Sequence, residues 1–225
     1  KVTKDVFKLL LGPNHSVKIP DLLMPSSICN KANYIISLGE VCKWLGDQAS
    51  EMGVDVFSGF AADELIFDEN NRYVKGIATA DTGIDKSWAP KDSFQRGMEL
   101  HAKQLVLAEG CRGSLSERVI KRFNLREGKD VQSYGIGLKE VWEVPEHNLI
   151  PGLVEHTAGV RLSQSIYGGT FMYHMGPNLI HLGMVVGLDY KNPYINPYQE
   201  FQRWKLHPEV KKYLDTAAEN ASAPV

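Results

Sequence analysis

The feature that most constrains the fold is the stretch of residues 105–118, LVLAEGCRGSLSER. Leu105–Val106–Leu107 is typical of a strand buried on both faces, and two glycines separate it from a run at Ser116–Phe123 with helical periodicity. Glycine allows close backbone approach to a ligand, and the N–H groups at a helix N-terminus favour a pyrophosphate or a flavin edge. Glu109 is then placed to accept hydrogen bonds from a ribityl hydroxyl. An ordinary strand-to-helix turn explains the same spacing, so the motif alone does not decide.

Composition limits the class of protein. The 225 residues are 43% hydrophobic and 23% charged, enough for one sizeable core or two partial ones. The net charge is -2 and charges of both signs are interspersed, which excludes the clustered basic surface of a nucleic-acid binder. Cys29, Cys42 and Cys111 are odd in number and far apart, so we interpret them as reduced thiols in an intracellular compartment. Four histidines lack metal-ligand spacing and are interpreted as solvated or strand-facing: His15, His156, His174 and His181.

The N-terminal segment contains two apolar runs, Val6–Leu11 and Val17–Met24, on either side of the turn-favouring residues 12–15, GPNH. This pattern predicts a hairpin or a paired loop. Its apolar side chains are either buried under another element or exposed as a patch, and composition alone favours burial slightly. The runs are far shorter than the roughly 20 residues of a spanning helix, and the segment does not resemble a signal peptide. Because an initiator Met is absent, we expect the chain to begin inside a longer protein.

The rest of the chain reads as a succession of short elements with a domain boundary near Lys129. An amphipathic helix is predicted over Tyr34–Met52, with Gly53 as its C-terminal cap. Strands are predicted at Val54–Phe57, Ala62–Phe67 and Tyr73–Ala80, and beyond Gln132 at Tyr134–Val144, Leu153–Val160, Gly169–His174 and Leu179–Leu188. Two further helices are predicted at Pro197–Trp204 and Glu209–Leu214, followed by a small-residue tail, 216–225, expected to be disordered.

Five stretches between Asn33 and Pro208 resemble the electron-transfer flavoprotein:ubiquinone oxidoreductase family, and the whole match runs from about Phe7 to Pro208. They are NYIISLGEVCKWLGDQASEMGVDVFSGFAADELIFDENNRYVKGIATADTGIDK, PKDSFQRGMELHAKQLVLAEGCRGSL, YGIGLKEVW, YGGTFMYHM and GLDYKNPYINPYQEFQRWKLHP. The resemblance implies a mixed α+β and α/β fold. It combines part of an FAD-binding domain of the glutathione-reductase/hydroxybenzoate-hydroxylase type with an antiparallel β-sheet quinone-binding domain and flanking helices. The expected division is an apolar membrane-facing hairpin at 1–32, FAD-domain residues 33–130, ubiquinone-domain residues 131–215 and the tail 216–225.

The same resemblance implies an activity and its partners. Electrons would pass from reduced electron-transfer flavoprotein through FAD to ubiquinone at a membrane surface, which is the mitochondrial inner membrane on its matrix face or the bacterial cytoplasmic membrane. The cofactor carries the chemistry in such proteins, so no catalytic acid, base or nucleophile is predicted. No metal ligand is predicted in these residues either, and a 4Fe-4S cluster is expected only in a C-terminal part outside them.

Site residues follow from the resemblance position by position. The positions matching FAD contacts are Ser37, Leu38, Phe60, Ala61, Ala62, Ala108, Glu109, Gly110, Gly113 and Ser114. The positions matching the quinone site are Tyr167, Gly168, Gly169 and Thr170, where a bulge or hairpin turn is the competing interpretation of the glycine pair. The membrane-facing positions are Leu9, Leu10, Leu11, Ile19, Leu22 and Leu23, with Lys4, Lys8 and Lys18 at head-group level.

Departures from the family leave a second hypothesis open. The Gly-x-Gly-x-x-Gly fingerprint and the four cluster cysteines are absent from these residues, and the stretch KKYLDTAAENASAPV differs from the family's continuation. Other segments or chains are therefore expected to complete the enzyme. The alternative is a non-catalytic structural subunit of a larger respiratory membrane complex. A flavin monooxygenase relative is a third possibility, against which the stretches of the quinone half argue.

Overall fold

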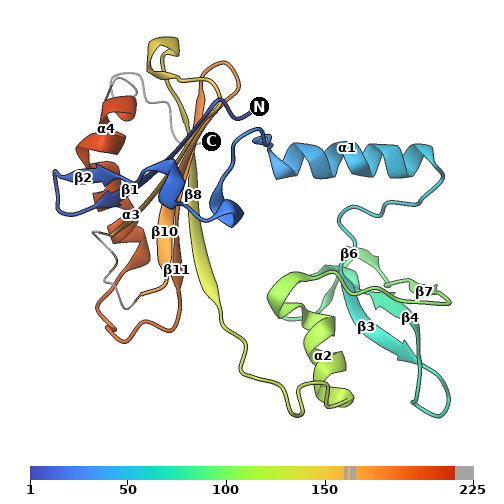
Figure 1. The fold of residues 1–225 in the computed structure, drawn as a ribbon. Coiled ribbons are helices and arrows are strands. Elements are labelled where there is room, and N and C mark those ends of the chain that lie inside the picture. The colour runs from blue at the N-terminus through green and yellow to red at the C-terminus, as the bar shows by residue number, and fades with distance from the viewer. Residues whose placement is uncertain (160–161, 163–165, 216–225) are drawn as a thin grey trace. The chain divides into compact units, whose positions relative to one another are not determined.

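The computed structural model describes residues 1–159, 162 and 166–215, so the predicted disordered tail lies outside the described residues (Figure 1). The chain forms two compact units. Unit 1 consists of Lys1–Val41 and Gln132–Val225, and unit 2 consists of Cys42–Val131. Helix α1 (Leu38–Glu51) begins in unit 1 and ends in unit 2. The combination of sheets and few helices is the mixed α+β fold expected from the sequence.

Unit 1 is built on a six-stranded sheet with the order β2-β1-β9-β10-β11-β8. Its strands are β1 (Lys4–Leu10), β2 (Ser16–Lys18), β8 (Gly135–Glu143), β9 (Leu153–Gly159), β10 (Gly168–Met175) and β11 (Leu179–Gly187). All neighbouring pairs are antiparallel except β1 and β9, which are parallel. Short 3-10 turns lie at Asp21–Leu23 (η1), Ser26–Ile28 (η2) and Glu146–Asn148 (η4). The four strands predicted between Tyr134 and Leu188 are confirmed.

Two helices, α3 (Pro197–Lys205) and α4 (Pro208–Leu214), cover one face of this sheet (Figure 1). Each starts with a proline in its first turn behind a capping side chain, Asn196 for α3 and His207 for α4. The helices bury Phe201, Trp204 and Val210 against the sheet residues that alternate toward them. These sheet residues are Met172, Ile180, Leu182, Met184 and Val186. Both predicted helices are confirmed, and Trp204 of α3 is one of the most deeply buried side chains of the core.

The N-terminal strand belongs to this core. Val17 and Ser16 of β2 pair with Leu9 and Leu10 of β1, which confirms the predicted hairpin, and β1 also pairs along its whole length with β9. Side chains of β1 therefore alternate between two faces, and Leu10 is 3% exposed within the core cluster. The prediction that Leu10 faces a membrane is wrong. The error arose because a parallel neighbour from far along the chain cannot be read from the local sequence.

An ion network ties β1 to the other end of the chain. Lys8 Nζ lies 2.8 Å from Glu155 on β9 and 2.7 Å from Glu209 on α4. Glu209 also accepts hydrogen bonds from Ser16 and Lys212. Burial raises the pKa of Glu155, and Lys8 opposes that shift. Burial also acts to raise the pKa of Glu209, but hydrogen bonds from Lys212, Lys8 and Ser16 overcome it and hold the value at about 2. Lys8, which was predicted to lie at the level of lipid head groups, instead forms ion pairs within unit 1.

Unit 2 is smaller and more open. It contains a three-stranded antiparallel sheet in the order β3-β4-β7, a two-stranded ribbon β5-β6, and α2 (Ser114–Arg122), which packs on β3. The strands are β3 (Ala62–Phe67), β4 (Val74–Thr79), β5 (Thr82–Ile84), β6 (Pro90–Gln95) and β7 (Glu99–His101), and a 3-10 turn η3 spans Gly110–Arg112. The predicted strand pair, the helix over Ser116–Phe123 and the α1 helix are confirmed. Gly53, with φ of +88°, caps α1 as expected.

Two predicted strands of unit 2 are wrong. Residues 54–57 and 105–107 have no strand assignment, and Val106 is 78% exposed rather than buried on both faces. A strand needs a neighbouring backbone to accept and donate its hydrogen bonds, and neither segment has a paired strand among the described residues. Local apolar character predicted the element but could not supply its partner.

Candidate functional site

The four predicted quinone positions lie at the beginning of β10 in unit 1. Gly168 is tightly packed, because a Cβ atom there would overlap the Val185 carbonyl oxygen and lie 2.7 Å from Leu162 Cδ1. A Cβ on Gly169 would lie 3.1 Å from the Thr157 carbonyl oxygen. The glycine pair is neither a hairpin turn nor an unpaired loop, since both residues pair with β11. Close backbone approach within the sheet is therefore one reason for glycine at these positions.

Tyr167 and Thr170 have different surroundings. Tyr167 is 80% exposed, and its carbonyl accepts a hydrogen bond from Gly187 N at 2.7 Å. Thr170 is buried on the helix-covered face, where its hydroxyl contacts the Thr157 hydroxyl, which also accepts a hydrogen bond from Trp204 Nε1 at 3.1 Å. The Thr170 side chain therefore packs in the core and is not available to a ligand at the start of β10.

The face of the sheet opposite the helices carries an aromatic cluster that the sequence reasoning missed. It consists of His156 on β9 and Phe171 and Tyr173 on β10. The Phe171 and Tyr173 rings stack with centroids 4.9 Å apart and an interplanar angle of 28°. The Tyr173 hydroxyl lies 3.1 Å from His156 Nε2. The period-two spacing of Gly169, Phe171 and Tyr173 was the signal that could have revealed it.

Burial controls the protonation of this cluster. It lowers the pKa of His156, against a smaller opposing effect of the Asp5 carboxylate. It raises the pKa of the Tyr173 hydroxyl, and Asp5 adds to that shift. Near neutral pH both side chains are held in their uncharged forms, so His156 and Tyr173 share one hydrogen bond without a net charge.

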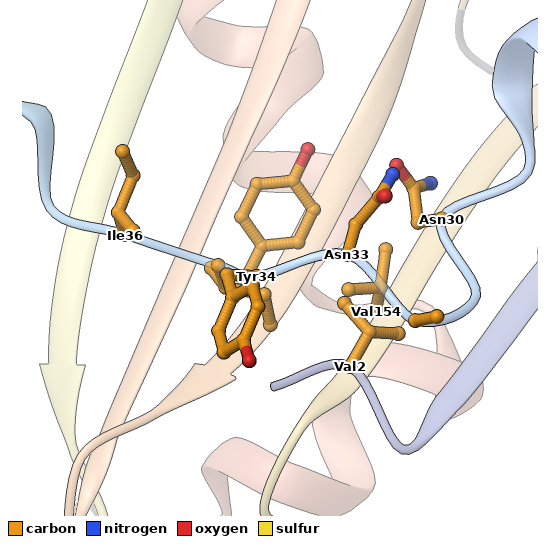
Figure 2. Close-up of a pocket in the computed structure, with 9 residues that line it drawn as sticks. Val2, Asn30, Asn33, Tyr34, Ile36 and Val154 are labelled. Atoms are coloured by element: carbon orange, nitrogen blue, oxygen red, sulfur yellow. The ribbon is translucent and has the colours of Figure 1, made fainter.

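A pocket of about 620 Å³ lies over the same face, where the segment 30–36 passes across the strands (Figure 2). Figure 2 shows Asn30 and Asn33 of this segment near Val154 of β9 and Val2, with Tyr34 and then Ile36 farther along the segment. Tyr173 completes the lining together with Ala32 and Ile35. Asp5 fixes the start of the segment, because its carboxylate accepts a hydrogen bond from Asn30 N at 2.6 Å. The pocket mixes amide, phenol and aliphatic groups.

The predicted flavin turn in unit 2 is arranged differently from the expectation. The Glu109 carboxylate lies against the start of α2, the helix that follows it. It accepts hydrogen bonds from Ser116 N and Oγ, both at 2.7 Å, from Leu115 N at 3.3 Å and from the Ser114 hydroxyl. The hydrogen bonds from Ser116 lower the pKa of Glu109 the most. Gly113 makes room for this arrangement, since a Cβ there would lie 2.8 Å from Glu109 Cδ.

Glu109 therefore acts as a cap of α2. The predictions that this carboxylate faces a ribityl hydroxyl and that the helix N–H groups are free for a pyrophosphate are wrong for this structure. Gly110 remains suited to close approach, because its φ is +78° and no atom lies within 4 Å of a Cβ built there. Ala108 precedes the turn in a segment without strand pairing.

The other predicted flavin positions are distributed over both units. Phe60, Ala61 and Ala62 lead into β3 of unit 2, with Phe60 half exposed and packed edge-on against Phe57 at 5.9 Å. Ser37 and Leu38 lie at the start of α1 in unit 1. A pocket of unit 2 is lined by Glu64, Leu65, Phe67, Arg118 and Arg122, none of which is a predicted flavin position. The role of the predicted positions in flavin binding stays a prediction.

The predicted membrane-facing leucines other than Leu10 lie at the surface. Leu22 is 94% exposed and Leu23 71% exposed in the turn η1, and Leu11 is 60% exposed after β1. Leu9 is partly exposed and Ile19 is half-buried. None of the helices in the described residues is long and apolar enough to cross a bilayer. The described residues also contain no cluster of three His, Cys, Asp or Glu side chains arranged to hold a metal ion.

Known proteins match the chain over nearly its whole length. A family model described as "ETF-QO, ubiquinone-binding" matches residues 134–222. The probable mitochondrial electron transfer flavoprotein-ubiquinone oxidoreductase of Saccharomyces cerevisiae is 50% identical over 95% of this chain and 33% of its own length. The mitochondrial Homo sapiens protein of that name is 48% identical over 95% of the chain and 34% of its own length. The Pseudomonas aeruginosa protein is 45% identical over 95% of the chain and 39% of its own length. The chain thus spans about a third of these relatives.

Solved structures share the fold at low identity. A triple mutant of the flavin-dependent brominase Bmp2 has a TM-score of 0.57 at 17% identity and covers 95% of this chain and 47% of its own. A geranylgeranyl bacteriochlorophyll reductase-like protein from Thermoplasma acidophilum has a TM-score of 0.55 at 16% identity, over 77% of this chain and 38% of its own. At these identities the likeness concerns the fold alone.

Proposed function

We propose, from the premise that this chain belongs to the electron transfer flavoprotein-ubiquinone oxidoreductase family, that it supplies the quinone-binding part of an enzyme that reduces ubiquinone. The carrying observation is that the ubiquinone-binding family match, residues 134–222, begins next to β8, an edge strand of the sheet, and includes β10 with Gly168 and Gly169. All three relatives are named as oxidoreductases, which favours the enzyme over the structural subunit.

The role of the chain in this reaction is to position a ring. Reduction of ubiquinone to ubiquinol takes up two electrons and two protons, and its carbonyl oxygens become hydroxyl groups. A flat ring can approach the backbone at Gly169 because no side chain projects there, and a backbone N–H near the start of β10 can donate to a quinone carbonyl. Phe171 and Val185 then border the ring on the same face of the sheet.

FAD, when bound, supplies the electron-transfer chemistry of such an enzyme. The residues of this chain that fit its approach are the backbone at Gly110 and the segment leading into β3, whereas the amides at the start of α2 are occupied by Glu109. We propose that Phe60–Ala62 and Gly110 contribute to the flavin site and that other segments provide its phosphate cradle. Electron-transfer flavoprotein is the proposed electron donor, by the names of the relatives.

The proposed place of action is a membrane surface, in the mitochondrion or in a bacterial cell, as the names and organisms of the relatives suggest. The exposed Leu22 and Leu23 would insert among lipid head groups while Lys18 stays outside. Converting both leucines to Ser should weaken binding to lipid vesicles by at least about tenfold. Leu206→Ser, another exposed leucine of unit 1, is the matched control and should leave binding unchanged.

The central test uses the native protein with every chain and cofactor that accompanies it. Steady-state reduction of ubiquinone-1 by reduced electron-transfer flavoprotein should be observed, and extraction should release FAD. Gly169→Val should raise the KM for ubiquinone-1 more than it lowers kcat, because it fills the space over the backbone. A native preparation without flavin that neither binds nor reduces ubiquinone-1 would refute the proposal.

A further inference from the structure

The strand β10 presents three residues in a row on the face opposite the helices. Gly169, Phe171 and Tyr173 alternate with the buried Thr170, Met172 and His174, so they share this face. Residues two apart on a strand are separated by about 7 Å. Phe171 is therefore the nearest β10 side chain to the space over Gly169. A ligand ring above that glycine would have Phe171 as its neighbour along the strand.

The Phe171 ring lies flat on the sheet because the residue opposite it on β11 is a glycine. Phe171 pairs with Gly183 of β11, and a Cβ at Gly183 would overlap the ring, lying 2.6 Å from its Cε1 atom. The ring therefore crosses over the β11 backbone instead of standing upright. Any residue larger than glycine at position 183 would displace it.

Neighbouring side chains fix the ring further. Tyr173 stacks on Phe171, and the hydroxyl of Tyr173 is itself held by His156 at 3.1 Å. His156, on the neighbouring strand β9, is also the residue paired with Phe171. The ring is thus fixed along the strand by Tyr173 and across the strand by Gly183. On the remaining side, toward Gly169, no side chain of β10 intervenes.

The next row of paired residues across the sheet, beside Phe171, carries few side chains. Gly169 pairs with Val185, and Val185 pairs with Gly137 of β8, so only one side chain of these three projects from the face. No atom lies within 4 Å of a Cβ built on Gly137, and Val185 is 38% exposed. Along this row the backbone at Gly169 and Gly137 carries no side chain, so a flat ring beside Phe171 can lie over it.

We infer that Phe171, seated on Gly183, is a positioning residue whose ring stacks against the quinone ring bound beside Gly169. The inference rests on the proposed function and adds the side chain that fixes the plane of the head group. Offset or edge contacts between rings contribute enough to change affinity by about 3- to 10-fold. Gly183 acts by positioning the Phe171 ring and does not itself contact the quinone ring.

The test uses the native protein, with ubiquinone-1 as the probe in both steady-state kinetics and equilibrium dialysis. Phe171→Leu should raise the KM and the dissociation constant by about 3- to 10-fold while kcat changes less than about twofold. Gly183→Ala should have a similar effect. In the double variant the second substitution should add almost nothing, because both remove the same contact. Phe94→Leu, an exposed phenylalanine of β6 in unit 2, is the control and should leave both constants unchanged.

Two further results separate the possible failures. The fold-changes should be equal for ubiquinone-0, which has no isoprenoid tail, and for ubiquinone-1; an effect seen only with the tailed quinone would overturn the ring contact. If Gly169→Val weakens quinone binding but Phe171→Leu does not, the quinone binds without Phe171 and the inference fails alone. If the unmodified protein binds no quinone, the proposed function fails with it.

Discussion

The two units differ in how their apolar side chains are covered. Among the described residues, every buried hydrophobic side chain of the core lies in unit 1 except Leu115 of α2. In unit 1, α3 and α4 close one face of the six-stranded sheet with Phe201 and Trp204. In unit 2, by contrast, many large apolar side chains are exposed, including Trp44, Leu45, Met52, Val56, Phe57, Phe60 and Val106. The difference lies in the covering elements and not in apolar content.

The helix α1 shows what this difference teaches. Its apolar residues follow the helical period, and the sequence correctly predicts a helix there. Yet Leu38 is 68% exposed, Leu45 is 52% exposed and no residue of the helix is buried, so the face that periodicity marks as internal is not covered. Periodicity predicts the element and the face that will be buried, but burial itself depends on a partner surface.

The largest test of this contrast compares one tryptophan from each unit. Trp204 is 1% exposed and donates a hydrogen bond to Thr157, so Trp204→Ala should lower the free energy of unfolding of unit 1 by about 3–5 kcal/mol. Trp44 of α1 is 59% exposed, and Trp44→Ala should change stability by less than about 0.5 kcal/mol. Urea unfolding with hydrogen exchange resolved by segment measures both. Equal losses for the two variants would contradict the contrast.

A second test compares ion pairs. Lys8→Met leaves Glu155, which is 2% exposed, without its cation, and should destabilise unit 1 by about 3 kcal/mol. In unit 2 Arg112 pairs with Glu117 at 3.4 Å with its side chain 73% exposed, so Arg112→Met should cost less than about 1 kcal/mol. The same unfolding measurement applies. A loss for Lys8→Met no larger than that for Arg112→Met would show that the network is not buried in solution.

A third test uses pH. Burial lowers the pKa of His174 from 6.5 to about 4; its Nδ1 accepts a hydrogen bond from Ile150 N at 3.0 Å, and Nε2 has no hydrogen-bond partner among the described residues. The folded state favours the neutral ring, so this stabilisation is complete above pH 6.5 and is lost as the pH falls toward 4. Unit 1 should lose roughly 2 kcal/mol more than its His174→Asn variant between pH 7 and pH 4.

The control for the pH test is His101→Gln, an exposed histidine of unit 2. Its unfolding free energy should follow the pH dependence of the unmodified chain. Identical pH profiles for the unmodified chain and His174→Asn would mean that His174 is accessible to solvent in the folded state, contrary to the interior position of a residue only 1% exposed.

The smallest effect is expected at the Glu109 cap in unit 2. Glu109→Ala removes the acceptor for Ser116 N and Leu115 N, so amide exchange in the first turn of α2 should accelerate by roughly fivefold. The β10 and β11 amides of unit 1 should not change. Glu99→Ala, at an exposed carboxylate of β7, is the matched control and should leave α2 exchange unaltered. Unchanged exchange at Ser116 would remove the capping assignment.

The sequence predicted the elements of unit 1 well because their signals are local. Strands such as β10 and β11 are marked by turns at both ends, and α3 begins with the Asn196–Pro197 cap signature. What it could not predict depends on distant partners. Leu10 is buried by the parallel pairing with β9, and residues 105–107 lack a paired strand among the described residues.

The site was predicted unevenly for the same reason. Gly169 was predicted as the first residue of a strand, whereas β10 begins one residue earlier at Gly168, and the tight packing of the pair against Val185 and Thr157 becomes visible only in three dimensions. The capping role of Glu109 was missed because a carboxylate that reaches seven residues forward to Ser116 leaves no sequence pattern. The aromatic cluster of His156, Phe171 and Tyr173 joins two strands, and only the β10 half of it follows a readable alternation.

The parallel pairing of β1 with β9 has a consequence for how the chain assembles. Lys8 must find Glu155 147 residues later and Glu209 201 residues later. Contacts of such long range are formed late and slow the search for the native topology. During synthesis β1 can pair only with β2 until β9 has left the ribosome, so one edge of this apolar strand stays unpaired until then. Shielding of β1 by a chaperone is thus most needed before β9 and α4 emerge.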